Sequence, residues 1–205
     1  MNRLFNEIRT QRILIRCPEI RDAPDVFLAK KRSMQSLKTW MDWAQNPSSL
    51  NADEQFIQEA IALNGQENPG SLPLFMFQKE SGAFIGSSGF VSIDWAVRSF
   101  EIGYWIDTRF EKQGFVTEAV HALCWFAFKH FNANRVQITC DHKNEASRKI
   151  PERLSFSLEG QLKNHRITPG TGKVSDTLIF GLTDPDKLSQ PDGYVSSYGE
   201  KSDER

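Results

Sequence analysis

Hydrophobic and polar positions repeat along the chain with two different periods, which mark strands and helices. Residues 12–16, RILIR, alternate apolar and charged side chains and therefore predict a strand. Residues 22–44 and 51–63 place apolar side chains at helical spacing, with Asp22 and Asn51 as candidate N-caps. The first third of the chain is expected to form one strand followed by two helices.

The middle third predicts three strands and then a helix. Residues 74–78 and 83–93 are joined by the turn sequence KESG, which is typical of a hairpin. A third strand is expected at residues 99–107. Residues 117–132 are apolar on most faces of a helix, so this helix should be buried against a sheet.

The last third predicts a strand at residues 135–140, a short helix at residues 144–154 and a final pair of strands at residues 159–167 and 176–183. This order of elements predicts an α/β (α+β) fold with a mixed, mostly antiparallel central sheet that is flanked by helices. A single domain is expected over residues 1–184.

Residues 185–205 are polar and carry too few apolar side chains for a core, so they are expected to form a flexible tail. The chain has 205 residues, which is the size of one domain. Its formal net charge of −1 argues against a general nucleic-acid binder. No apolar stretch is long enough to cross a bilayer, and the N-terminus has no apolar signal segment, so a soluble protein is expected.

Cysteine and histidine usage predicts neither a disulfide framework nor a metal site. The three cysteines, Cys17, Cys124 and Cys140, are far apart, and two of them lie in apolar runs, which indicates buried thiols. The four histidines form no ligand cluster, so no metal is expected. Reduced thiols are typical of the cytoplasm.

The segment EKQGFVTEAV, residues 111–120, passes from polar residues through one glycine into an apolar helical pattern. A strand–glycine–helix turn points free backbone N–H groups away from the positive end of a helix dipole, which suits a phosphate or pyrophosphate. Gly114 lets the backbone come close to such a group. In the alternative interpretation, Gly114 only makes a turn and Thr117 caps the helix. The segment is neither a Walker loop nor a GxGxxG fingerprint.

Several motifs, taken in order, resemble one known family. The segments FEIGYWID, EKQGFVTEAV and NRVQITCDHKNEASRKIPERLSF resemble the GNAT superfamily of N-acetyltransferases. The helical pair LKTWMDW and ADEQFI, with TQRILIR before it and EGQLKNHRI and SDTLIFGLTDPD near the end, looks like the ribosomal-protein-serine acetyltransferase (RimJ/RimL-type) branch. The resemblance runs over about residues 10–185 and implies a single GNAT-like domain.

The resemblance implies that acetyl-CoA is the cosubstrate and that backbone amides of the glycine turn bind its pyrophosphate. The residues concerned are Gln113, Gly114, Phe115, Val116 and Thr117. The family pattern has a basic or amide residue where this chain has Glu111, and a small residue where it has Val116.

A later family motif, Asn-x-x-Ser at the start of a helix, is matched by Asn144 and Ser147, and the resemblance implies that Asn144 contacts the coenzyme. Pro151 falls inside this helix, where a proline removes a hydrogen bond. Ser155 replaces a glycine that would end the helix in the left-handed conformation. We therefore expect the helix to be short or bent.

Acyl transfer from a thioester to an amine needs a base for the amine proton, a donor for the oxyanion and a proton for the departing thiolate. Glu101 is the candidate base, or alternatively a solvated residue of an amphipathic strand. A backbone N–H around Trp105 or Ile106 is the candidate donor to the thioester carbonyl. The resemblance assigns the thiolate donor to Ser147, whose alternative is an ordinary serine in the first turn of a helix.

Candidate contacts to the acceptor come from three segments. Trp40 and Trp43 lie three residues apart, either as a packing stripe or, as the resemblance implies, as the floor of the acceptor cleft. Asp176 is a candidate contact to the amine or a solvated strand end, and His165 is a cleft residue or a polar strand position. Tyr104 is either a further donor to the thiolate or a core residue.

The leading hypothesis is a cytoplasmic acetyl-CoA-dependent N-acetyltransferase whose acceptor is a protein N-terminal amine. A small-molecule amine, such as an antibiotic or a polyamine, is the alternative acceptor. A second hypothesis takes the departures at Glu111, Val116, Pro151 and Ser155 as the mark of a GNAT-fold binding protein with impaired catalysis. Homodimers are common in this branch, although no feature of the sequence requires one, and neither a nucleic-acid nor a membrane partner is expected.

Overall fold

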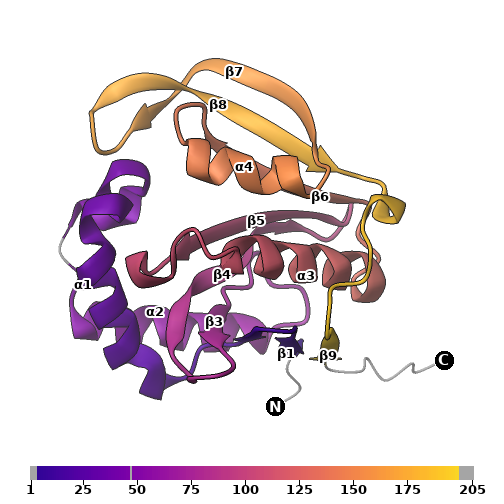
Figure 1. The fold of residues 1–205 in the computed structure, drawn as a ribbon, viewed down its shortest axis with the longest axis horizontal. Helices are drawn as coiled ribbons and strands as arrows, with labels where there is room; N and C mark the ends of the chain where they lie inside the picture. Colours follow the sequence, from indigo (N-terminus) through magenta and orange to yellow (C-terminus); the bar gives the residue numbers. More distant parts are fainter. Residues whose placement is uncertain (1–3, 47, 199–205) are drawn as a thin grey trace.

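The computed structural model describes residues 4–46 and 48–198. Within these residues the strands are β1 Phe5–Arg9, β2 Ile13–Arg16, β3 Phe75–Gln78, β4 Phe84–Asp94, β5 Ser99–Ile106, β6 Arg135–Asp141, β7 Ser157–Thr168, β8 Lys173–Leu182 and β9 Val195–Tyr198. The α-helices are α1 Ala23–Trp40, α2 Leu50–Asn64, α3 Phe115–His130 and α4 Glu145–Arg153 (Figure 1). Short 3₁₀ helices are η1 Ile20–Asp22, η2 Asp42–Gln45, η3 Thr108–Phe110 and η4 Pro185–Lys187.

The strands form one sheet in the order β7-β8-β6-β5-β4-β3-β2-β1-β9. Every neighbouring pair is antiparallel except β5 and β6, which run parallel. The predicted mixed, mostly antiparallel sheet flanked by helices is therefore confirmed. The one parallel pair arises because α3 carries the chain back along the sheet between β5 and β6.

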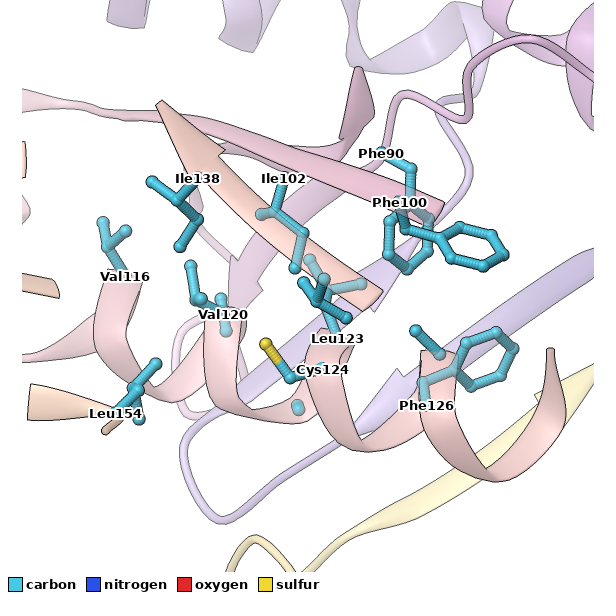
Figure 2. Close-up of a cluster of buried hydrophobic side chains, with 14 of the residues drawn as sticks. Phe90, Phe100, Ile102, Val116, Val120, Leu123, Cys124, Phe126, Ile138 and Leu154 are labelled. Carbon is cyan, nitrogen blue, oxygen red and sulfur yellow. The ribbon is translucent and has the colours of Figure 1, made fainter. Parts of the chain in front are cut away.

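Helix α3 packs against one face of the sheet, as its apolar sequence predicts. In Figure 2, Val120 and Leu123 of α3 lie beside Ile102 of β5 and Ile138 of β6, and all four side chains are buried. Each fully buried side chain of this size contributes about 1.5–3 kcal/mol to folding. This interface holds the N-terminal end of α3 in a fixed place relative to β5 and β6.

Helices α1 and α2 cover the opposite face. Strand alternation directs Phe75 and Phe77 of β3 to this side, where they pack in a cluster with Val26 of α1 and Ile57 of α2. Met76, between the two phenylalanines, belongs to the core on the α3 side. The sheet therefore separates two hydrophobic clusters, one under each helical layer.

The central strands β5 and β6 are paired over a short distance only. Their pairing ends with Glu101 opposite Gln137, and no further pair between them follows in the described part of the chain. From Ile102 onward the two strands separate, and β5 loses its partner on that side. We call the gap beyond Glu101 the strand opening.

The hairpin of β7 and β8 reaches over to the far end of α1 (Figure 1). At its tip, the Gly170 N–H donates a hydrogen bond of 3.2 Å to the carbonyl oxygen of Thr39. A Cβ atom at Gly170 would lie 2.6 Å from the Thr39 Cα, so only glycine fits this contact. The tip of the β7–β8 hairpin and the C-terminal end of α1 are thereby joined across the strand opening.

The predicted helix at residues 22–44 is divided in the structure. Helix α1 ends at Trp40, and the chain then turns into η2. The side-chain amide of Gln45 donates to the carbonyl oxygens of Lys38 (2.8 Å), in the last turn of α1, and Met41 (3.1 Å), which also accepts the Ala44 N–H. This cap explains why the helical pattern of the sequence continues while the helix does not.

Two predicted caps also differ. Helix α2 is capped by Ser49, whose hydroxyl accepts a hydrogen bond from the Ala52 N–H, so Asn51 is not the cap. Asp22 occupies the position before α1, but its carboxylate forms an ion pair with Arg16 at 2.6 Å and caps no N–H of that helix. Among the described residues no helix is long and apolar enough to cross a bilayer.

The expected flexible tail, residues 185–205, differs in its first part. Strand β9 pairs antiparallel with β1 at the edge of the sheet, and Leu188 is buried against the core. The sequence predicts neither β1 nor β9, because both are short; β1 pairs locally with β2, whereas β9 gains its partner β1 only through contacts distant in sequence. The described fold thus continues past residue 184, while residues 199–205 lie outside the described part.

Candidate active site

A cavity of about 790 Å³ lies at the strand opening. Its walls come from α1, η2 and α2 on one side and from β6 and α4 on the other, with β4 and β5 between them. Glu101, Trp105 and Ser147 line it, together with Trp40 at the end of α1 and Trp43 of η2. The structure therefore brings together candidates from three separate segments of the sequence.

Glu101 lies in this cavity, at the last position where β5 pairs with β6. The Thr139 hydroxyl donates a hydrogen bond of 2.7 Å to one carboxylate oxygen, and the Gln137 amide lies 3.3 Å from the other. Both donors belong to β6, so the carboxylate is held at the mouth of the strand opening. A carboxylate fixed in a cavity can accept the proton of a bound amine.

The backbone of β5 offers N–H groups to the strand opening. The Asp107 N–H donates to Ile85 of β4, and strand alternation directs the N–H of Trp105 to that same side. The N–H groups of Tyr104 and Ile106 then point away from β4, toward the opening. The predicted donors are the N–H groups of Trp105 and Ile106, and of these only the Ile106 N–H points to the opening. The Tyr104 N–H points the same way, and Tyr104, unlike Ile106, is among the residues that line the cavity.

Tyr104 contacts Ser147 across the opening. Its hydroxyl donates a hydrogen bond of 3.0 Å to the Ser147 carbonyl oxygen and lies 3.1 Å from the Ser147 hydroxyl. Burial raises the pKa of Tyr104 well above its usual range, so the phenol stays protonated at neutral pH. Tyr104 both packs against the core and lines the cavity, because the separated strands let residues from both faces of β5 reach it.

Helix α4 begins at the cavity. The Asn144 side-chain oxygen accepts a hydrogen bond of 3.1 Å from the Ser147 N–H and so caps the helix. Both residues line the cavity. The helix has nine residues with Pro151 inside it, so the expected short helix is confirmed, and Ser155 adopts the left-handed conformation, with φ of 60°, although it is not a glycine.

The glycine turn has the geometry of an anion site. Gly114 has φ of 83° and stands at the N-cap of α3, so Thr117 is not the cap. In the described part of the chain, no acceptor faces the backbone N–H groups of residues 113–117. The Val116 side chain points into the core (Figure 2) and is 9% exposed, which leaves the amide side of the turn clear. The turn therefore fits a pyrophosphate.

Arg12, which the sequence analysis did not single out, holds this turn in place. Its guanidinium donates to the Gln113 carbonyl oxygen at 2.9 Å, pairs with Glu118 at 2.6 Å and lies over the Phe115 ring at 4.6 Å. Its Nη2 atom is the nearest atom to a Cβ built at Gly114, at 3.4 Å. A permanent positive charge thus stands beside the free amides, and no local signal reveals it because Arg12 is distant in sequence.

Aromatic rings line the side of the cavity formed by α1, η2 and α2. Trp40 and Trp43 both line it, although they belong to different helices, and the Trp43 ring lies 6.0 Å from that of Trp105. Lys30 lies over the Trp43 ring at 5.1 Å and forms an ion pair of 2.5 Å with Asp53. Sequence reasoning missed Lys30 and Asp53 because each is a single charged residue within a predicted helix, and only the packing of α1 against α2 brings the two together.

Asp176 and His165 lie away from the cavity. The Asp176 carboxylate accepts hydrogen bonds from the Asn164 N–H and from the side chains of Lys163 and Gln161, which lower its pKa to about 2. His165 contacts the Thr177 hydroxyl at 3.0 Å. Neither residue is among those that line the cavity, so the structure does not place them near the candidate base.

The described residues contain no group of three or more His, Cys, Asp or Glu side chains that could hold a metal ion.

Cys140 lines the cavity near Ser147, and burial raises the pKa of its thiol to about 11. The thiol is therefore protonated at neutral pH and a poor nucleophile. Glu101, Tyr104, Ser147 and the backbone of β5 are the candidates for chemistry in the cavity.

Comparison with known proteins gives a family match over residues 12–157, to the acetyltransferase (GNAT) domain. The "Putative ribosomal N-acetyltransferase YdaF" of Bacillus subtilis (strain 168) is 33% identical over 159 residues, which cover 75% of this chain and 82% of that protein. The ribosomal-protein-serine acetyltransferase of Escherichia coli (strain K12) is 31% identical over 130 residues, covering 62% of this chain and 70% of that protein.

Solved structures share the fold. RimL, a ribosomal L7/L12 alpha-N-protein acetyltransferase in complex with coenzyme A, superposes with a TM-score of 0.78 at 22% identity, covering 85% of this chain and 95% of that one. The microcin C7 self-immunity acetyltransferase MccE, in complex with acetyl-CoA and AMP, superposes with a TM-score of 0.76 at 24% identity, covering 85% and 93%.

Proposed function

Since this chain belongs to the GNAT acetyltransferase family, and is thereby an acetyl-CoA-dependent N-acetyltransferase, we propose that its acceptor is the N-terminal amine of a protein. The observation that carries the proposed chemistry is the placement of Glu101 and the Tyr104–Ser147 pair in one cavity, at the strand opening. A base for the amine, on β5, and a donor for the thiolate, at the start of α4, thus face one space.

The reaction follows from these positions. Glu101 takes a proton from the acceptor ammonium, directly or through water, and passes it to solvent. The freed amine attacks the thioester carbonyl, and a β5 N–H, for which Tyr104 is best placed, stabilises the oxyanion. A nitrogen–carbon bond forms, the nitrogen loses its second proton to solvent, and the carbon–sulfur bond breaks. The Ser147 hydroxyl donates a hydrogen bond to the leaving thiolate, which departs as a thiol with a proton from solvent.

The coenzyme is held by the glycine turn. The free N–H groups of residues 113–117 stand at the positive end of α3 and bind the pyrophosphate of acetyl-CoA. Arg12, which donates to the Gln113 carbonyl oxygen and pairs with Glu118, holds these N–H groups in place. Asn144 and Ser147, at the start of α4, contact the pantetheine arm.

The acceptor enters from the side of α1 and α2. The relatives named as ribosomal-protein acetyltransferases support a protein N-terminus as the acceptor. Trp43 is 46% exposed beside Trp105, and such a broad aromatic wall suits the first residues of an extended peptide. Trp40 forms part of the same wall.

The test measures release of free thiol from acetyl-CoA in the presence of peptides with different N-terminal residues, of polyamines and of aminoglycosides. The proposal expects turnover with a subset of the peptides and mass spectra with one added acetyl group on the α-amine. Turnover with only small amines contradicts the protein acceptor but leaves the enzyme class intact. Binding of acetyl-CoA without any turnover would favour a binding protein with impaired catalysis.

A further inference from the structure

The carbonyl oxygen of Ser147 lacks its ordinary helical partner, and the cause lies in the sequence. In a regular α-helix this carbonyl would accept a hydrogen bond from the N–H of residue 151. Position 151 of α4 is a proline, which has no N–H and whose ring presses against the carbonyl four residues earlier. The Ser147 carbonyl must therefore find a donor outside its helix.

That donor is Tyr104. Its hydroxyl lies 3.0 Å from the Ser147 carbonyl oxygen, and because a carbonyl only accepts, the phenolic proton points at Ser147. The phenolic oxygen also lies 3.1 Å from the Ser147 hydroxyl. With its own proton already committed, Tyr104 can only accept from that hydroxyl. One proline thus sets the direction of both hydrogen bonds.

This contact crosses the strand opening. Past Glu101 no ladder pair joins β5 to β6 among the described residues, so the first turn of α4, which follows β6, has no backbone tie to β5 there. Tyr104 and Ser147 are 43 positions apart in the chain and supply that tie. The link holds the Ser147 hydroxyl at the cavity wall, on the side opposite the Glu101 carboxylate.

We propose that Pro151 is a positioning residue of the acetyl-transfer site: by leaving the Ser147 carbonyl free for Tyr104, it fixes the first turn of α4 and holds the Ser147 hydroxyl at the cavity wall, where its O–H turns from the Tyr104 oxygen to the thiolate as the thiolate departs. Pro151 itself touches no substrate. The role of Ser147 toward the thiolate rests on the proposed function, whereas the dependence of the Tyr104–Ser147 bond on the proline does not.

The dependence on the proline is tested without any activity measurement, by thermal unfolding of four forms: wild type, Tyr104→Phe, Pro151→Ala and the double variant. With the proline present, Tyr104→Phe removes the donor that the Ser147 carbonyl has outside its helix and lowers Tm. With Pro151→Ala, the restored N–H satisfies that carbonyl, so the same change should lower Tm by less than half as much. Equal losses of Tm in the two backgrounds would overturn the inference.

The catalytic consequence is tested with the same four forms. Pro151→Ala should lower kcat about tenfold, leave the KM for acetyl-CoA within about twofold and not lower Tm, because alanine is the better helix former. In the Tyr104→Phe background, Pro151→Ala should add no further loss of kcat. An unchanged kcat, or the same additional loss in both backgrounds, contradicts the positioning role.

Pro185→Ala provides a matched control. Pro185 stands at the start of η4, where a proline removes no helical hydrogen bond. Its replacement should therefore change neither kcat nor the loss of Tm that Tyr104→Phe causes. If the wild type itself transfers no acetyl group, the proposed function fails, and the unfolding cycle still decides whether the proline sets the Tyr104–Ser147 bond.

Discussion

The Thr139 hydroxyl donates a hydrogen bond of 2.7 Å to the Glu101 carboxylate at the point where β5 and β6 separate. Gln137, two residues earlier on β6, approaches the other carboxylate oxygen at 3.3 Å. The two strands whose divergence opens the cavity therefore also orient the candidate base. Changes at this junction are expected to alter catalysis more than folding.

Glu101→Gln tests the base directly. Glutamine keeps the size of the side chain and can still accept from Thr139, but it cannot take the proton of the amine. We expect kcat to fall about 100-fold at neutral pH and the rise of rate toward alkaline pH to flatten. Calorimetry should give an acetyl-CoA affinity within about twofold of wild type. A wild-type pH–rate profile in this variant would rule out the base role.

Thr139→Val tests the orientation of that base. Valine has nearly the same shape as threonine but no hydroxyl, so the Glu101 carboxylate loses its shorter hydrogen bond. We expect kcat to fall about tenfold, since an ionised hydrogen bond contributes about 1.5–3 kcal/mol. Thr139→Ser is the matched control and should retain most of the activity. Equal loss in both variants would point to packing at Thr139 instead.

Gly114→Ala tests the glycine turn. Gly114 has φ of 83°, a conformation that costs a residue with a Cβ about 1–2 kcal/mol. We expect the KM for acetyl-CoA to rise about tenfold, because the turn must shift and misalign its free N–H groups. Gly172→Ala is the control, with φ of 64° in the β7–β8 turn and no atom within 4 Å of the added Cβ. It should lower stability by a similar amount without changing KM.

Asp107 predicts how stability depends on pH. Burial by itself raises the pKa of this carboxyl, but hydrogen bonds from Arg32 and Arg109 outweigh burial and hold the pKa below its usual value of 3.8. Because the folded pKa is the lower one, this stabilisation is complete above about pH 4 and is lost as the pH falls through the folded pKa. The thermal midpoint of the wild type should therefore decrease below about pH 4.

Asp107→Asn serves as the comparison in that measurement. The amide leaves two arginines without a counter-charge, so the variant should be less stable at pH 7 by about 2 kcal/mol. Its midpoint should also change less between pH 5 and pH 3 than the midpoint of the wild type. Parallel pH curves for the two proteins would show that other carboxyl groups dominate acid unfolding.

The sequence predicts the order of strands and helices well where the signals are local. The alternation in FEIGYWID, the glycine before α3 and the proline in α4 each act over a few residues, and the structure confirms the elements built on them. The short strand β1 and the edge strand β9 escape prediction because neither is amphipathic enough to be recognised without its partner.

The cavity is harder to predict, because it depends on where two strands stop pairing. Strand alternation places Tyr104 and Glu101 on opposite faces of β5, so the sequence gives no sign that both reach one space. Arg12 is distant from the glycine turn in sequence, and only the folding of the sheet brings the two together. Asp176 is a polar strand residue whose partners lie on the same hairpin, and no pattern distinguishes it from a residue that contacts an amine.

A crystal structure with bound acetyl-CoA is the most direct test of the account. The account predicts pyrophosphate oxygens about 2.7–3.2 Å from the backbone nitrogens around Gly114, and the thioester in the cavity between Glu101 and Ser147. A coenzyme whose pyrophosphate lies away from this turn, or whose thioester lies outside the strand opening, would contradict it.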